Sequence, residues 1–214
     1  TVQPLKVKYP QGSEKQLIHT ITGREVPRGK LPVDAHALVF NVATAAAIYD
    51  AVTLGKPLIE RITTVTGCVG TPKNLKLRIG SSFNDAVAAA GGLTDKAAMV
   101  LAGGPMTAPC AWNLSAVIGK ASGGILVLDE KQAKDEEESP CIRCGRCVEV
   151  CPIRLYPYQI KNDVEHNDLE AAKQDGILDC ILCGACSYVC PARRYLTANC
   201  KAGKEEIAAR ARRK

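Results

Sequence analysis

Residues 141–152 read CIRCGRCVEVCP and residues 180–191 read CILCGACSYVCP, so eight of the eleven cysteines lie in two copies of one spacing. In each copy the cysteines are separated by two, two and three residues, and proline follows the last one. This run is a known [4Fe–4S] ligand spacing, in which three thiolates bind one cluster and the fourth reaches the other cluster. The pattern therefore predicts two [4Fe–4S] clusters and two half-motifs that should not fold well without both clusters.

The spacing rule assigns each cysteine to a cluster. The first predicted cluster takes three ligands from the first copy and one from the second, namely Cys141, Cys144, Cys147 and Cys190. The second predicted cluster takes the complementary set, namely Cys180, Cys183, Cys186 and Cys151. Gly145 and Gly184 occupy the same place in each copy, where we expect the backbone to need a positive φ.

Zinc binding and disulfide bonding are the alternative roles for these cysteines. Structural zinc sites use paired C-x2-C knuckles, and each copy here has more cysteines than a knuckle needs. A disulfide framework is typical of small secreted chains, which this composition does not resemble. The remaining cysteines have no partner spacing, and we expect buried small residues at Cys68, Cys110 and Cys200.

Composition limits the function classes. The formal net charge is +6, but residues 201–214 hold six basic and two acidic residues, so the rest of the chain carries only +2. No aromatic residue interleaves with this basic tail, which argues against a nucleic-acid partner. No apolar run approaches 18 residues, so we expect no transmembrane segment. Residue 1 is Thr, which suggests a processed chain or a fragment.

The remaining patterns predict an α/β and α+β multidomain chain. Residues 1–57 alternate between strands, expected at Leu5–Tyr9 and Ala37–Phe40, and helices that begin at Ser13 and Asn41. Residues 58–130 read as strands around one short helix, a small β-grasp type module. A charged linker, 131–140, opens a helical cluster domain that extends to residue 200. A basic tail, 201–214, follows, for which a solvated end and a helix on a partner or on anionic lipid are the alternatives.

Several further segments are distinctive enough to be compared with a known family. They are YPQGSEKQLI at 9–18, TGREVPRGKLP at 22–32, NVATAAAIYDAV at 41–52, GKPLIER at 55–61 and AGGPM at 102–106. Together with the two cysteine motifs, the second ending in SYVCPAR, these segments resemble the C subunits of Rnf complexes, which are membrane-bound NAD:ferredoxin oxidoreductases. The resemblance covers nearly the whole chain.

The resemblance implies three modules. These are part of a complex-I-like α/β domain that binds NADH and FMN (1–57), an SLBB β-grasp module (58–130) and a helical dicluster ferredoxin domain (131–200). It also implies nucleotide and flavin contacts at Glu14, Asn41 and Thr44. Ser13 and Ala43 stand where the pattern has glutamates, and the glycine-rich flavin loop lies upstream of the matching segment and is not in this chain. The resemblance therefore implies FMN for a full-length subunit and incomplete FMN binding by this chain alone.

The implied function is electron transfer. The chain would pass electrons between NADH/FMN and membrane redox subunits through two [4Fe–4S] clusters, as a subunit of an ion-translocating oxidoreductase. It would lie at the cytoplasmic face of the cell membrane as a peripheral protein with NAD(H) and the other subunits as partners. A cobalamin reductase of microcompartments shares the three modules and is the alternative. A metal-stapled nucleic-acid-binding protein is a third hypothesis, which predicts strongly salt-dependent binding.

Overall fold

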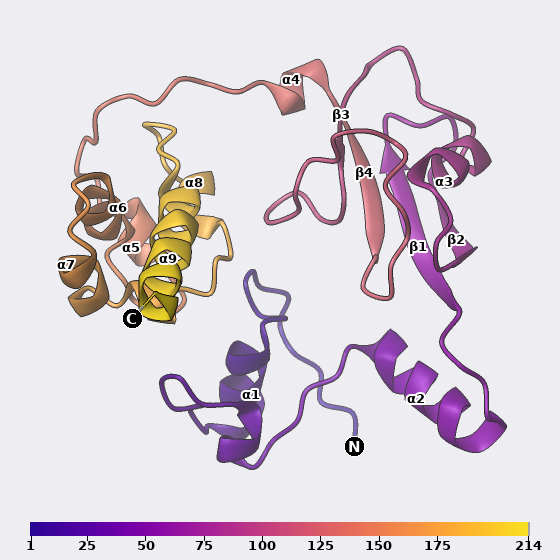
Figure 1. Ribbon diagram of the computed structural model, residues 1–214, viewed down its shortest axis with the longest axis horizontal. Coiled ribbons are helices and arrows are strands. Elements are labelled where there is room, and N and C mark those ends of the chain that lie inside the picture. Colours follow the sequence, from indigo (N-terminus) through magenta and orange to yellow (C-terminus); the bar gives the residue numbers. More distant parts are fainter. Residues whose placement is uncertain (214) are drawn as a thin grey trace. The chain divides into compact units, whose positions relative to one another are not determined.

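The structure is a computed structural model that describes residues 1–213. The chain divides into two compact units. The cluster unit consists of residues 1–39 and 136–214, and the sheet unit consists of residues 40–135. Figure 1 shows the helices of the cluster unit and the strands of the sheet unit.

The sheet unit contains four strands, β1 (Glu60–Gly67), β2 (Lys73–Arg78), β3 (Ala97–Leu101) and β4 (Gly124–Asp129). Their order in the sheet is β2-β1-β4-β3. The central pair β1 and β4 is parallel, with Thr64 opposite Gly124, whereas β2 and β3 run antiparallel to their neighbours. The mixed sheet confirms the α+β class predicted for this part of the chain.

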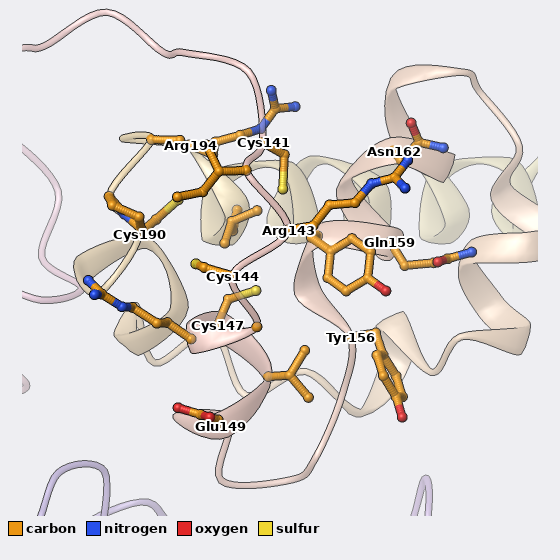
Figure 2. Close-up of a pocket in the computed structure, with 18 residues that line it drawn as sticks. Cys141, Arg143, Cys144, Cys147, Glu149, Tyr156, Gln159, Asn162, Cys190 and Arg194 are labelled. Atoms are coloured by element: carbon orange, nitrogen blue, oxygen red, sulfur yellow. The ribbon is translucent and has the colours of Figure 1, made fainter.

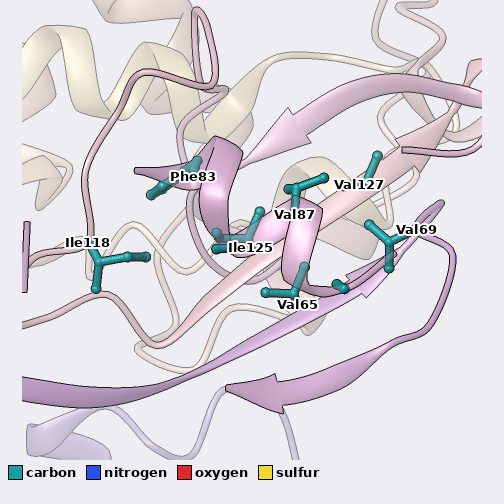
Figure 3. Packing of buried hydrophobic residues seen from close by; sticks show 9 residues of the cluster. Val65, Val69, Phe83, Val87, Ile118, Ile125 and Val127 are labelled. Atoms are coloured by element: carbon teal, nitrogen blue, oxygen red, sulfur yellow. The ribbon is translucent and has the colours of Figure 1, made fainter. Parts of the chain in front are cut away.

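The core of the sheet unit forms where helix α3 (Phe83–Ala89) covers the sheet (Figure 3). Alternate residues of β1 and β4 point to this side, because successive side chains of a strand face opposite ways. The fully buried members include Val65, Ile125 and Val127. Gly67 lies so close to β4 that an added Cβ would meet the carbonyl oxygen of Val127 at 2.0 Å, so this position requires glycine.

The sheet unit also holds the helices at its two ends, α2 (Val42–Leu54) and α4 (Glu130–Ala133). Helix α2 begins at Asn41, whose side chain accepts a hydrogen bond from the amide of Ala43 at 2.9 Å, and ends at Gly55. None of its residues is buried. The helix predicted from Asn41 is confirmed.

The N-terminal part of the cluster unit has two helices and lacks the predicted strands. Helix α1 (Glu14–Thr22) ends at Gly23, and a 3-10 helix, η1, spans Pro32–Ala35. The strands predicted at Leu5–Tyr9 and Ala37–Phe40 are wrong, since no strand is assigned there. Neither the alternation at Leu5–Tyr9 nor the apolar run at Ala37–Phe40 makes a strand by itself, because a strand needs a neighbour to pair its backbone groups.

The rest of the cluster unit is helical, as predicted. Its helices are α5 (Arg146–Glu149), α6 (Pro157–Glu165), α7 (Leu169–Gln174), η2 (Ile177–Asp179), α8 (Ala185–Tyr188) and α9 (Leu196–Arg212). Helices α6, α7 and α9 pack together around a core that includes Ile160, Ile177 and Cys200 (Figure 1). Residues 201–212, expected to be a basic tail, belong to α9, where Gly203 and Ile207 are buried.

Ion pairs of a buried lysine, Lys161, join the expected linker (131–140) to this helical core. Lys161 of α6 is only 2% exposed, and its Nζ lies 3.0 Å from Glu138 Oε1 and 2.6 Å from Glu165 Oε1. Glu136 Oε2 lies 2.6 Å from Nε of Arg193. The acidic end of 131–140 is therefore part of the cluster unit. No helix among residues 1–213 is both long and apolar enough to cross a bilayer.

Candidate iron–sulfur centres

The two cysteine motifs adopt the same local structure. In each, a loop carries the first two cysteines and a one-turn helix, α5 or α8, follows the glycine. Gly145 has φ 77° and Gly184 has φ 82°, which confirms the positive φ expected there. The residue before the second cysteine is also left-handed, with φ 55° at Arg143 and 54° at Leu182.

These left-handed residues carry information because they are costly. A residue other than glycine with positive φ costs about 1–3 kcal/mol and persists only where its surroundings impose it. A third pair, Arg154 (φ 56°) and Arg193 (φ 53°), lies three residues after the fourth cysteine of each motif. The left-handed conformation therefore occurs at three matching positions, and at two of them in costly residues other than glycine, which indicates that the loops are shaped around a common group.

The first cavity gathers cysteines from both motifs. It has a volume of about 830 Å³, is open to solvent, and its cysteines are Cys141, Cys144, Cys147 and Cys190. Figure 2 shows Cys144 and Cys147 next to each other, with Cys190 on a separate segment of the chain. These are the cysteines that the spacing rule assigns to the first cluster.

Positive charge exceeds negative charge in the wall of the first cavity, where Glu149 is the acidic residue. Arg143, Arg146 and Arg194 belong to its wall. Arg194 is also paired with Glu165, since Nη2 lies 3.2 Å from Oε2. Arg193, which the sequence places beside these residues, pairs with Glu136 instead and is not part of the wall.

The second cavity gathers the complementary set. Its cysteines are Cys151, Cys180, Cys183 and Cys186, together with Cys200 of α9. The other wall residues are mostly apolar and include Ile153, Leu155 and Ile160. The space between the walls is only about 20 Å³.

The residues present fit iron–sulfur clusters. Each cavity has at least four cysteine side chains, and thiolates are the ligands that these clusters prefer. A zinc site requires a different geometry, because all four sulfur ligands must lie about 2.3 Å from the same zinc ion. Among residues 1–213 no three His, Cys, Asp or Glu side chains form a group that could hold a single metal ion. In a cluster each thiolate binds a separate iron.

Hydrogen bonds reach the sulfur atoms of both cavities. The amide of Leu155 donates to Cys151 Sγ at 3.3 Å, and Cys147 accepts from the backbone of Tyr158. Burial raises the pKa of Cys186 to about 11, against the opposing effect of a hydrogen bond with Thr197. Because only a thiolate binds iron, metal must supply the free energy that deprotonates this buried thiol.

Cys200 is a member of the second cavity that sequence reasoning missed. It is 1% exposed, so the expected burial is confirmed for Cys200, whereas Cys110 is exposed and Cys68 is half-buried; the place of Cys200 in the cavity wall was not expected. The pKa of Cys180 is lowered, with the hydrogen bond from the Cys200 side chain as the largest cause. No local pattern marks Cys200, because its place in the wall depends on the packing of α9.

The N-terminal segment contacts the second motif. The hydroxyl of Tyr9 donates a hydrogen bond to the carbonyl of Cys183, and Nε of Arg28 lies 3.1 Å from Asp179 Oδ1. Tyr9 opens the YPQGSE segment, which is therefore anchored to the loop that carries Cys183. Sequence reasoning missed both contacts, and no local pattern predicts them.

The three residues predicted to contact the nucleotide or flavin have different surroundings. Glu14 is exposed in the first turn of α1, where a carboxylate is favourable to the helix dipole. Asn41 caps α2, and Thr44 is half-buried in its first turn. Glu14 belongs to the cluster unit, whereas Asn41 and Thr44 belong to the sheet unit.

Three family models match successive parts of the chain. Residues 1–50 match the Nuo51 FMN-binding domain, residues 62–109 match the SLBB domain, and residues 132–191 match the 4Fe–4S dicluster domain. The fold and the paired cysteine cavities thus define a redox protein that joins part of a flavin-binding module to a dicluster domain.

Curated relatives narrow this class. The C subunit of the proton-translocating ferredoxin:NAD(+) oxidoreductase complex of Clostridium ljungdahlii is 45% identical over 172 residues, 80% of this chain and 38% of the relative. The C subunit of the Na(+)-translocating complex of Acetobacterium woodii is 43% identical over 213 residues, 99% of this chain and 48% of the relative. The C subunit of the ion-translocating oxidoreductase complex of Rhodobacter capsulatus is 39% identical over 178 residues, 83% of this chain and 34% of the relative.

The chain is therefore a homologue of the C subunits of ion-translocating ferredoxin:NAD(+) oxidoreductase complexes. It spans between about a third and a half of the length of these relatives. The resemblance seen in the sequence is confirmed.

Proposed function

We propose that this chain transfers electrons between an NADH- and FMN-linked site and the membrane redox subunits of an ion-translocating NAD:ferredoxin oxidoreductase. The observation that carries the proposal is the exchange of the fourth cysteine. Cys190 of the second motif lines the first cavity, and Cys151 of the first motif lines the second cavity. This exchange is the ligand arrangement of two-cluster ferredoxins.

The proposed ligands follow from the two cavities. The first [4Fe–4S] cluster is held by Cys141, Cys144, Cys147 and Cys190. The second is held by Cys180, Cys183, Cys186 and Cys151. When bound, such clusters carry one electron each, whereas a flavin accepts a hydride as an electron pair, so the relay divides pairs into single electrons.

The protein's own residues give the two sites different environments. The arginines at the first cavity favour the more negative, reduced state of a cluster through their charge. The apolar wall of the second cavity excludes water and disfavours added negative charge. The two clusters therefore differ in electrostatic setting, as an ordered relay requires.

The proposed nucleotide and flavin contacts are Glu14, Asn41 and Thr44. Support comes from the match of residues 1–50 to an FMN-binding domain. Tyr9 adds a structural reason, because its hydrogen bond to Cys183 anchors the same segment to the second cluster loop. Asn41 would combine this role with its capping of α2. Other subunits of the complex and the cytoplasmic face of the membrane are the proposed surroundings.

The test compares cysteine variants of the full chain prepared without oxygen. Cys190→Ser and Cys141→Ser should remove the same EPR signal, while Cys180→Ser should remove the other. Iron and acid-labile sulfide should fall from about eight to about four per chain in each variant. If Cys190→Ser instead matched Cys180→Ser, the exchange of ligands would be disproved.

A second measurement tests the relay itself. In the assembled complex, NADH should reduce both wild-type clusters within one turnover. Cys190→Ser should interrupt electron transfer to ferredoxin while leaving NADH-dependent flavin reduction intact. Unchanged ferredoxin reduction in that variant would refute the proposed function.

A further inference from the structure

A chain of hydrogen bonds ends at a sulfur atom of the second cavity. The amide of Thr197 donates to Ser187 Oγ at 2.9 Å, the hydroxyl of Ser187 donates to Thr197 Oγ1 at 3.1 Å, and Thr197 Oγ1 lies 3.3 Å from Cys186 Sγ. Thr197 lies in the first turn of α9, and Ser187 lies in α8. The chain therefore joins two helices at the cavity wall.

The direction of the last bond follows from the others. Ser187 Oγ accepts a hydrogen bond from the amide of Thr197 and donates its only hydroxyl proton to Thr197 Oγ1. Thr197 then keeps its own proton, which is free to point at Cys186. Once Cys186 is a thiolate bound to iron it has no proton to give, so Thr197 is the donor.

Cys200 supplies a second donor in the same helix. It lies three residues after Thr197, on the same face of α9, and lines the cavity with Cys180. Its side chain hydrogen-bonds Cys180 and is 1% exposed. When Cys180 binds iron as a thiolate, the proton of this bond belongs to Cys200.

The first motif lacks this pair of side-chain donors. With the motifs aligned on their cysteines, Tyr158 takes the place of Thr197 and Lys161 takes the place of Cys200. Cys147 accepts its hydrogen bond from the backbone of Tyr158, and Lys161 is engaged by Glu138 and Glu165. At the first cavity, arginine side chains supply the positive charge instead.

We infer that Thr197 and Cys200 are positioning residues that raise the reduction potential of the cluster at the second cavity. An added electron makes the cluster more negative, and hydrogen bonds to its thiolates become stronger in that state. They offset the apolar wall, which opposes reduction. The inference rests on the proposed function, because it requires that the second cavity holds a cluster.

The two clusters then respond differently to salt. Arg143 and Arg146 act on the first cluster through an open, solvated cavity, where dissolved ions screen charge. The Thr197–Cys186 contact is part-buried and Cys200 is 1% exposed, so salt screens these two bonds less than it screens the arginine charges. Raising the ionic strength should lower the potential of the first cluster more than that of the second.

The experiment is an anaerobic EPR-monitored redox titration of the cluster-loaded full chain. Thr197→Val and Cys200→Ala should each reduce the equilibrium constant for reduction of one cluster by up to tenfold, which corresponds to about 59 mV for one electron. Thr197→Ser keeps the hydroxyl and should restore the wild-type potential. Tyr158→Phe keeps the backbone donor at the matching position of the first site and should change neither potential.

Each outcome decides one question. Unchanged potentials in both variants, or a shift in Thr197→Ser as large as in Thr197→Val, would overturn the inference while leaving the clusters in place. Loss of about four irons in both variants would show that the residues hold the cluster itself, which also overturns it. Absence of iron and sulfide from the wild-type chain would refute the proposed function instead.

Discussion

Replacement of Lys161 by methionine tests how the cluster unit is held together. Lys161 Nζ contacts Glu138 Oε1 at 3.0 Å and Glu165 Oε1 at 2.6 Å, and the side chain is 2% exposed. Methionine fills a similar volume but leaves two carboxylates without their shared cation. We therefore expect Lys161→Met to destabilise the cluster unit strongly.

The expected loss of unfolding free energy depends on the solvation and the partners that Glu138 and Glu165 keep once Lys161 is replaced. Removing one partner of a buried ion pair costs about 3–5 kcal/mol. Here the Glu138 and Glu165 side chains are 24% and 40% exposed, so water solvates them in part. Glu165 also keeps Arg194 at 3.2 Å, and Glu138 keeps the amide of Tyr195. The cost should therefore lie near the lower limit, about 3 kcal/mol.

The assay is thermal unfolding of the cluster-loaded chain under anaerobic conditions, followed by circular dichroism and cluster absorbance. A loss of about 3 kcal/mol should lower the midpoint by about 12 °C or more in a unit of this size. The control is Lys173→Met, which breaks the exposed pair with Glu170 at 2.7 Å. It should cost less than about 1 kcal/mol. Equal shifts in the two variants would refute the reasoning.

The effect of Lys161→Met should also depend on pH. Burial alone would raise the pKa of Glu138, but the hydrogen bond from Tyr195 and the ammonium of Lys161 outweigh it and lower the pKa. A carboxyl with a lowered pKa contributes stability above its unfolded pKa and loses that contribution as pH falls through the folded value. The difference in unfolding free energy between the wild type and Lys161→Met should therefore become smaller at acidic pH.

Two further predictions concern the same helices. Gly203→Ala places a Cβ 2.6 Å from the γ-methyl of Val164 and 2.6 Å from Ile177, and Val164 is rigid in its helix. The resulting overpacking costs about 1–3 kcal/mol, which should exceed the gain of about 1 kcal/mol from helix propensity. We therefore expect a net loss of stability, measured by urea unfolding. Burial and then the neighbouring carboxylate of Asp175 raise the pKa of Asp163, so the stabilising contribution of the protonated Asp163 carboxyl is lost as pH rises. Asp163→Asn should therefore stabilise the chain at pH 7 but not at pH 3, as measured by thermal midpoints.

Controls separate these effects from general damage. Ala202→Gly, at an exposed position of α9, should cost about 1 kcal/mol from propensity alone. A stabilised Gly203→Ala would show that α6 and α9 are not closely packed there. An Asp163→Asn variant that loses stability at neutral pH would show that the carboxylate is needed in its charged form.

The sequence predicted those features whose causes are local. The cysteine spacing specifies a loop, a glycine at positive φ and one helical turn, and all of these involve neighbouring residues. The helices and the sheet strands followed from apolar periodicity and from glycine and asparagine at helix ends. The gathering of Cys190 with the first motif was also predictable, because the spacing rule includes it.

The rest depends on tertiary contacts that no local pattern encodes. Val7 alternates with polar residues and Leu38 lies in a short apolar run, two patterns typical of strands, yet both residues are exposed, since no neighbouring strand pairs with them. Lys161 is buried because two glutamates distant from one another in sequence meet it. Thr197 reaches Cys186 only because α9 packs beside α8.

The exchange of cysteines between motifs also limits how the protein is made. During synthesis Cys141, Cys144 and Cys147 emerge from the ribosome well before Cys190, so the first cavity lacks one wall until then. Through that interval three thiols stay open to oxygen and to stray metal ions. Iron–sulfur assembly on this chain must therefore follow translation of the second motif, and a chain that stalls between the motifs has neither site complete.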